Sequence, residues 1–190
     1  MRSHTYHTFG LALALLFPYV KSSTLTIGVL LSWDESSPSY SASFPGVINL
    51  AFDEIDDLNL LPNYDVRWVW HDTHCDDDEA GQAMQDFDEY GVDVVVGPAC
   101  SESAGEVYEF AEYFDIPLIS WAAPSISLSD SDTYPNMVRL LPDYAALAPA
   151  IAAFAAELGW ANVAVLHSED ARGLHAPTAA AVAEALGAAG

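Results

Sequence analysis

The sequence has almost no positive charge. Its 190 residues include five Lys and Arg against 28 Asp and Glu, which gives a formal net charge of −23 at pH 7. Such a field repels phosphate backbones and anionic membrane surfaces, so nucleic-acid binding is excluded. Because 52% of the residues are hydrophobic and 12% aromatic, we predict a packed globular chain with an acidic, solvated surface and not a disordered acidic tail.

Long apolar runs are also absent. The run LALALLFPYV (11–20) has about half of the roughly 20 residues that a membrane helix needs. It follows a weakly basic head and precedes small residues suited to cleavage near Ser22 or Ser23. We therefore predict a signal peptide over residues 1–23, export through the secretory pathway, and no membrane span in the rest of the sequence.

Cysteine is scarce, with only Cys75 and Cys100 in the chain. An exported chain with an even number of cysteines most often pairs them, so we expect a Cys75–Cys100 disulfide. Closing a loop of about 25 residues contributes roughly 3 kcal/mol of stability in the chain-entropy model.

After the signal peptide, short apolar runs alternate with helical patterns. This alternation predicts an α/β fold with a parallel sheet flanked by helices. The predicted strands cover residues 24–32, 64–73, 92–99, 116–123, 137–142 and 162–170, and the predicted helices cover 45–58, 76–91, a third around 107–114, 143–158 and 178–186. No strand follows the last helix, which indicates a truncated chain.

Three of these helices have apolar residues at helical spacing, which predicts a face packed on the sheet. Ser103 and Glu106 also match the spacing of a capping box at the start of the third helix. The predicted apolar faces consist of Val47, Ile48, Ala51, Ile55 and Leu58, then Ala80, Ala83, Met84 and Phe87, then Val107, Phe110, Ala111 and Phe114.

The stretch WHDTHCDDDE (70–79) gathers the residue types that bind metals. We predict no metal here, because Cys75 has an expected disulfide partner and because a calcium loop would place Ala80 on a ligand position. The stretch is instead predicted to be a strand end linked to a helix N-terminus. No role for His71 and His74 follows from the residues, and we expect them on a solvent-facing loop.

GPACSES (97–103) ends a predicted strand, where open α/β sheets bind ligands. Ser101 and Ser103 are candidate ligand contacts, and the alternative is that their hydroxyls cap the helix. A catalytic Ser101 is not expected, because the G-x-S-x-G elbow is missing. His167 ends another predicted strand and either faces the same crevice or belongs to a polar turn. For Arg139, a structural ion pair is favoured over ligand recognition.

The order of elements resembles the type I periplasmic-binding-protein fold. More narrowly, it resembles the ligand-binding region of natriuretic peptide receptors and receptor guanylate cyclases. Metabotropic GABA and glutamate receptors are more distant relatives in this resemblance. The most specific features are the GP-x-C motif (97–100), the upstream Cys75 and the strand that begins IPLIS. The resemblance is carried by LLPNYDVRWVWHDTHC, VVVGPACSESAGEVYEFAEYFDIPLISWAAPS, YPNMVRLLPDYAAL and WANVAVLHSED.

The resemblance implies two lobes around a cleft. Residues 24–141 would form most of the first lobe, and residues 142–190 would cross a hinge and begin an incomplete second lobe. The implied function is an extracellular receptor region that catalyses nothing and senses a peptide or small molecule by lobe closure or dimer rearrangement. The full-length receptor would be a homodimer at the plasma membrane, and this chain would be a fragment of it.

The resemblance also implies ligand-binding positions. Natriuretic-type receptors hold a chloride ion, for which the matching residues here are Thr73, Ala99 and Cys100; Ala99 stands where the family often has glycine. We expect no other cofactor.

Amino-acid-binding relatives use a hydroxyl after the cysteine and small or hydroxyl residues after the IPLIS strand. Ser101 fits the first position, whereas Ala122 and Ala123 offer only backbone groups at the second, which weakens an α-amino-acid ligand. Two alternatives stay open, a freestanding secreted solute-binding protein and, more remotely, a secreted α/β hydrolase.

Overall fold

The computed structural model describes residues 23–33, 44–168 and 175–189. Five strands form one sheet in the order β2-β1-β3-β4-β5, and every adjacent pair is parallel. The strands are β1 (Ser23–Leu31), β2 (Tyr64–Asp72), β3 (Val94–Val96), β4 (Leu118–Ser120) and β5 (Met137–Arg139). The predicted signal peptide lies outside the described residues except for Ser23, which begins β1.

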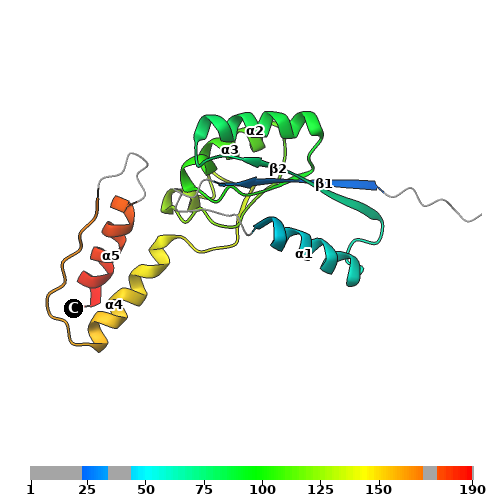
Figure 1. Cartoon of the computed structure of the whole chain (residues 1–190). Helices are drawn as coiled ribbons and strands as arrows, with labels where there is room; N and C mark the ends of the chain where they lie inside the picture. Colours follow the sequence, from blue (N-terminus) through cyan, green and yellow to red (C-terminus); the bar gives the residue numbers. More distant parts are fainter. Residues whose placement is uncertain (1–22, 34–43, 169–174, 190) are drawn as a thin grey trace, which may run out of the picture.

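The helices α2 (Asp77–Tyr90) and α3 (Ser101–Tyr113) cover one face of the sheet, and α1 (Phe44–Asp57) lies on the other (Figure 1). The predicted α/β class is therefore confirmed. The strands β3, β4 and β5 are shorter than predicted, with three residues each. The flanking residues of the predicted strands run into the loops at both ends.

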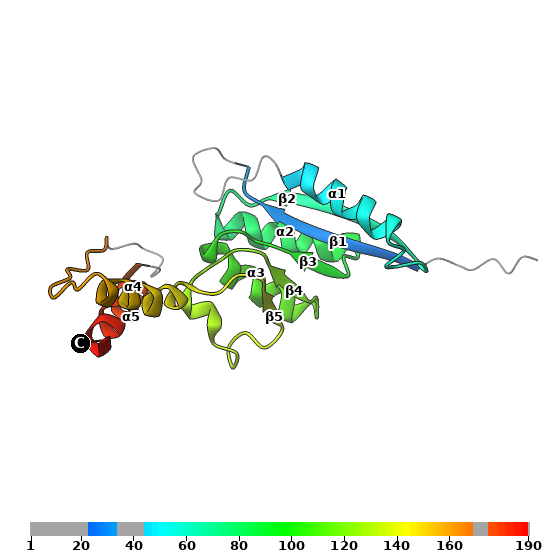
Figure 2. The ribbon, with the colours of Figure 1, turned by 90° about the horizontal axis from the view of Figure 1, so that it is seen from below.

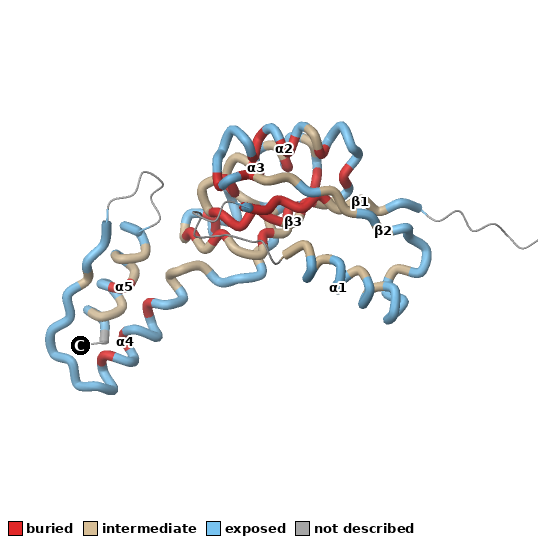
Figure 3. The backbone as a smooth tube through the Cα atoms, in the orientation of Figure 1, coloured by how far each residue is buried: buried red, intermediate tan, exposed pale blue. Residues whose placement is uncertain are grey.

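The main core lies between the sheet and the α2–α3 layer, where the buried residues gather (Figure 3). The predicted apolar face of α2 is confirmed, since Ala80, Ala83, Met84 and Phe87 are all buried. Close packing continues into β1, where a Cβ at Gly28 would come within 2.7 Å of the Phe87 ring. A side chain at Gly28 would therefore displace the largest fully buried residue of the domain.

The opposite face of the sheet is covered less completely. The helix α1 forms as predicted and lies beside β1 and β2 (Figure 2), with the ring of Phe52 stacked on that of Trp68. No residue of α1, all of which is described, is buried, and Val47 is 57% exposed. On the same sheet, Val138 of β5 is 56% exposed. The predicted apolar face of α1 thus meets the sheet only in part.

The last part of the chain leaves the sheet. A 3₁₀ turn, η2 (Tyr144–Ala146), leads into α4 (Leu147–Glu157), and α5 (His175–Ala189) runs beside α4 (Figure 1). The α5 helix begins before the predicted Thr178, because Pro177 is tolerated in a first helical turn. Within the described residues, no helix combines the length and apolar character needed to cross a membrane.

The predicted strand at residues 162–170 is wrong over residues 162–168, which have no regular structure; residues 169 and 170 lie outside the described part. The apolar pattern of this segment is that of a strand. A strand also needs a neighbour to receive its backbone hydrogen bonds. None of the strands in the described part pairs with this segment.

The core predicts that two aromatic residues of α2 contribute very differently to the free energy of unfolding. Phe87 is 1% exposed and Tyr90 is 69% exposed. Phe87→Ala should lower the free energy of unfolding by about 3–5 kcal/mol, because it removes a buried ring and leaves a cavity. Tyr90→Ala is the matched control and should change it by less than about 0.5 kcal/mol. Urea unfolding measures both, and similar losses in the two variants would contradict this core.

Candidate functional site

The carboxyl ends of parallel strands meet at one edge of the sheet, and we call this edge the carboxyl edge. It consists of the segments after the strands, namely Ser32–Trp33 after β1, Thr73–Cys75 after β2, Gly97–Cys100 after β3 and Trp121–Ser125 after β4. Because β1 lies between β2 and β3, the chain passes from β1 to β2 on one side of it, and then from β2 to β3 on the other side of β1. Such a switch point is where open α/β sheets bind ligands.

The predicted disulfide is confirmed. Cys75 and Cys100 are bonded, with their Cα atoms 5.5 Å apart. Both are buried and form a small cluster with Ala99, against which Trp121 and Ala122 pack. The disulfide therefore links the segment after β2 to the segment after β3, and the side chains after β4 rest on it.

Hydrogen bonds link the segments after β3 and β4 in the same region. The amide of Ala123 donates to the carbonyl of Ala99 at 2.9 Å, and the Ser120 hydroxyl lies within 3.3 Å of the Pro98 carbonyl. Gly97 is needed where the loop begins, since its φ is +119° and a Cβ would lie 2.5 Å from the Leu30 carbonyl oxygen. The loop after β3 is thus held on both sides.

Two buried backbone donors at this edge have no partner in the described part of the chain. The amides of Ala99 and Cys100 make no hydrogen bond there, although both residues are 3% exposed. Cys100 is the N-cap residue of α3, so its N–H lies at the positive end of a helix dipole, and the N–H of Ala99 directly precedes it. The arrangement can accept an anion or an oxygen-bearing ligand group.

Thr73 lies at the same edge and is 1% exposed. Its hydroxyl donates to the Leu31 carbonyl at 3.0 Å, and its Oγ1 accepts from the Cys75 amide at 3.4 Å. The structure therefore brings Thr73 close to the disulfide, with its hydroxyl proton directed at the β1 backbone.

The two candidate serines are placed differently. Ser101 is half-buried, and its Oγ accepts from the Ser125 amide at 3.1 Å. Ser103 is fully buried and donates to the Cys100 carbonyl. Capping of α3 by either hydroxyl, including the Ser103–Glu106 capping box, is wrong, because no side chain caps this helix. The reason is that α3 begins at Ser101, which places Ser103 inside the first turn.

The two candidate alanines also differ. Ala122 is half-buried and packs against the disulfide cluster. Ala123 is fully buried against Ala104 and Leu128, with a positive φ of 57°. Its amide is bonded to Ala99 and its carbonyl accepts from Arg139, so both of its backbone groups are already engaged.

His167 lies elsewhere. It lines a pocket of about 530 Å³ whose other lining residues come from η2, α4, α5 and the segment before α5, including Tyr144, Ile151 and His175. No residue of the carboxyl edge lines this pocket. The structure therefore brings Thr73, Ala99, Cys100, Ser101 and Ala122 together and does not bring His167 to them.

The predicted structural ion pair of Arg139 is confirmed. Its guanidinium donates to the carbonyls of Ala123 and Ser125, contacts Ser129, and lies 3.5 Å from the Asp143 carboxylate. The hydrogen bond from Ser129 lowers the pKa of Asp143, and the charge of Arg139 adds to this effect against the opposing effect of burial. These contacts fix the loop after β4.

Ser32 was missed as a site residue. It comes directly after β1, at the switch point, and is fully buried. The available signal was a polar residue immediately after an apolar run of strand type. Ser125 and Trp121 were also missed. Trp121 comes directly after the short strand β4, and Ser125 lies further along the loop that follows it.

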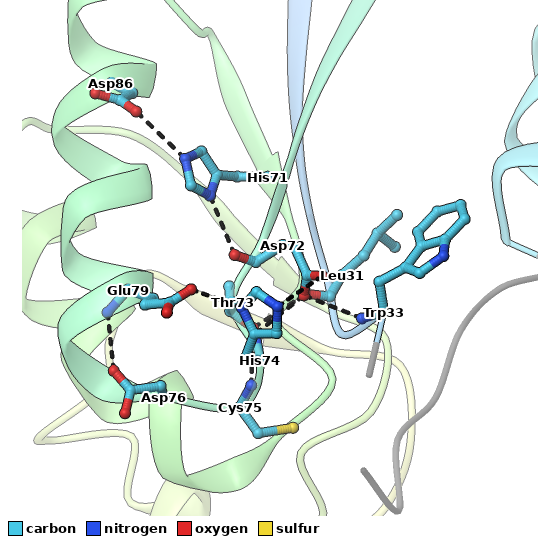
Figure 4. A network of polar contacts seen from close by, with 10 residues as sticks. All are labelled: Leu31, Trp33, His71, Asp72, Thr73, His74, Cys75, Asp76, Glu79 and Asp86. Atoms are coloured by element: carbon cyan, nitrogen blue, oxygen red, sulfur yellow. Dashed lines mark hydrogen bonds and ion pairs between the residues drawn. The ribbon is translucent and has the colours of Figure 1, made fainter. Parts of the chain in front are cut away.

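The expectation that His71 and His74 both lie on a solvent-facing loop is wrong for His71, which lies on β2, and incomplete for His74. Figure 4 shows both rings directed at carboxylates, His71 towards Asp86 on α2 and His74 towards Glu79 in the first turn of α2. Sequence spacing could not reveal these contacts, because they depend on how α2 packs against β2.

The chain is similar to known proteins over most of its length. Residues 45–189 match the model of the family described as "Receptor family ligand binding region". The resact receptor of Arbacia punctulata is 30% identical over 155 residues, which cover 70% of this chain and 15% of that protein. The receptor-type guanylate cyclase gcy-14 of Caenorhabditis elegans is 27% identical over 166 residues, which cover 82% of this chain and 15% of that protein.

The fold is that of type I periplasmic binding proteins. A solved ABC transporter substrate-binding protein from Desulfitobacterium hafniense superposes with a TM-score of 0.76 at 22% identity, over 88% of this chain and 48% of that protein. The chain thus spans about half the length of this structure and a much smaller share of the receptor relatives.

The disulfide generates a direct prediction. Non-reducing peptide mass spectrometry of the folded protein should find Cys75 and Cys100 in one cross-linked peptide. Replacing both by serine should lower the free energy of unfolding by roughly 3 kcal/mol, because the unfolded chain regains the freedom of the closed loop. Two free thiols in the folded protein would contradict the structure at this edge.

Proposed function

The chain belongs to the family of receptor ligand-binding regions, and from this membership we propose that it is the extracellular ligand-binding region of a cell-surface receptor. The observation that carries the proposal is the family match over residues 45–189. In this proposal the chain senses a peptide or small molecule for signal transduction and catalyses nothing itself. Cyclase activity is not assigned to these residues, because they span only 15% of relatives named as guanylate cyclases.

The proposed site is the carboxyl edge, with residues 24–141 as most of the first lobe and residues 142–190 as the hinge and the beginning of a second. The unpartnered amides of Ala99 and Cys100 support this site, together with the half-buried Ser101 and Ala122. In this account a complete second lobe closes over the edge and traps the ligand. The engaged backbone of Ala123 leaves Ala122 as the contact after β4.

We further propose that the full-length receptor is a homodimer at the plasma membrane. The exposed apolar residues Val47 and Leu50 of α1 support a contact surface on the face of the sheet opposite α2 and α3. This surface is separate from the carboxyl edge, so dimer rearrangement and ligand binding would use different parts of the lobe.

A freestanding secreted solute-binding protein is the second candidate. The similarity in fold to an ABC transporter substrate-binding protein favours it. A secreted α/β hydrolase has less support, because Ser101 makes no hydrogen bond to a histidine in the described part of the chain. The first two candidates share a binding edge and differ in the domains that the full protein carries downstream of it.

Sequencing the full-length transcript separates them. A receptor requires the rest of the second lobe, a membrane-spanning segment and an intracellular domain downstream of the region matched here. An open reading frame that completes the second lobe and then stops, with no membrane-spanning segment, would favour the freestanding binding protein and overturn the receptor proposal.

Chloride is proposed as a bound ion at the amides of Ala99 and Cys100, with Thr73 beside them. Because Thr73 donates to Leu31, the two amides would be the main donors. Thermal unfolding in sodium chloride and in sodium gluconate of equal ionic strength tests the proposal. At tenfold excess over Kd, chloride should add about 1.4 kcal/mol of stability.

The matched control for chloride is the variant in which both cysteines are serine, which frees the loop that carries the amides. It should lose the chloride-specific increment while keeping any general effect of salt. Equal stability of the unmodified protein in chloride and in gluconate would overturn the chloride proposal and leave the ligand-binding proposal untouched.

A further inference from the structure

Each histidine at the end of β2 lies between two acceptor groups (Figure 4). His74 Nδ1 is 2.6 Å from Glu79 Oε2, and its Nε2 is 3.3 Å from Asp72 Oδ2. His71 Nδ1 is 3.2 Å from the Asp72 carbonyl oxygen, and its Nε2 is 3.3 Å from Asp86 Oδ2. We call these five residues the histidine clamp.

Both contacts of each ring in the histidine clamp are hydrogen bonds only when each ring nitrogen carries a proton. A neutral imidazole has one N–H and one lone pair, whereas carboxylate and carbonyl oxygens only accept hydrogen bonds. One contact of each neutral ring is therefore a lone pair facing an oxygen, and only the imidazolium makes both contacts attractive. Acidification is the change that supplies a histidine ring with its second proton.

The histidine clamp joins the end of β1, the end of β2 and the first turn of α2. Asp72 ends β2, and its Oδ1 accepts from the amide of His74 and from the amide of Trp33, just after β1, each at 3.0 Å. Its Oδ2 faces the His74 ring, whose other nitrogen reaches Glu79 in the first turn of α2. Protonation of His74 therefore strengthens a link from the end of β1 through β2 to α2.

The turn inside the histidine clamp depends on such contacts. His74 and Cys75 have φ values of 47° and 58°, in the left-handed region that residues with a Cβ rarely adopt. Thr73 precedes them, and Cys75 carries the disulfide to Cys100. A stronger clamp thus stabilises the backbone that positions the proposed anion and ligand contacts.

The other charged groups of these elements do not replace the clamp. Asp76, Asp77 and Asp78 at the start of α2 are acids, so none of them supplies a positive charge at this turn. In the described part of the chain, the two arginines are engaged elsewhere, Arg67 with Asp65 and Arg139 with Asp143. The imidazolium ions are therefore the cations at this turn among the described residues.

We propose that His74, with His71 beside it, is a proton-operated clamp that tightens the turn between β2 and α2 as the pH falls through the imidazole range. The inference goes beyond the proposed function, because the clamp links β1, β2 and α2 whether or not a ligand is bound. Acidic conditions outside the cell would then order the carboxyl edge before a ligand arrives.

Hydrogen exchange of the full chain at pH 6 and pH 8, corrected for the intrinsic exchange rates, tests the inference without any ligand. Protection of the Trp33 and His74 amides should fall roughly three- to fivefold from pH 6 to pH 8, the scale of partly exposed ion pairs. His74→Gln should remove this pH response. His175→Gln, which removes a histidine on α5, is the matched control and should retain it.

Glu79→Gln provides a second variant if His74→Gln does not fold. It keeps the helix position and removes one carboxylate, so it should lose most of the pH response and leave protection at pH 8 unchanged. The inference is overturned if the unmodified protein shows no fall in protection, or if the variants at His74 and Glu79 respond to pH as the unmodified protein does. Neither result bears on ligand binding, so the proposed function is tested separately.

Discussion

The cross-linking of three loops at the carboxyl edge is the constraint on which the rest of the site depends. The Cys75–Cys100 disulfide joins the loops after β2 and β3, and the hydrogen bond from Ala123 to Ala99 joins the loops after β3 and β4. Each loop alone would lose too much conformational entropy to stay in one arrangement. Because they are linked, the N-terminus of α3 is held at the carboxyl edge with its amides in fixed positions.

The side chains of this edge mainly hold the backbone in place. The hydroxyls of Thr73 and Ser103 donate to carbonyls of the chain itself, and Ser101 accepts from the amide of Ser125. The donors left for a ligand are therefore the backbone amides of Ala99 and Cys100. The negative charge lies mostly on the outer helices, where burial and then the nearby Glu109, Asp77 and Asp78 raise the pKa of Glu106.

Local patterns predicted the features that depend on near neighbours in the sequence. The faces of α2 and α3 follow from apolar spacing, and the disulfide follows from two cysteines in a chain with a predicted signal peptide. The segment 162–168 was misjudged because a strand exists only beside a partner, which its own residues cannot specify. The contacts of His71 and His74 were missed because they form between β2 and α2, and Ser32 was missed because burial at a switch point follows from the strand order.

The central claim is that the carboxyl edge of this sheet receives the ligand. A crystal structure of the protein encoded by the full-length transcript, determined with its ligand, tests this directly. Ligand or anion density should contact the amides of Ala99 and Cys100 and lie beside Ala122. A ligand bound instead on the α1 face or against α4 and α5, with the carboxyl edge covered by the protein's own side chains, would contradict it.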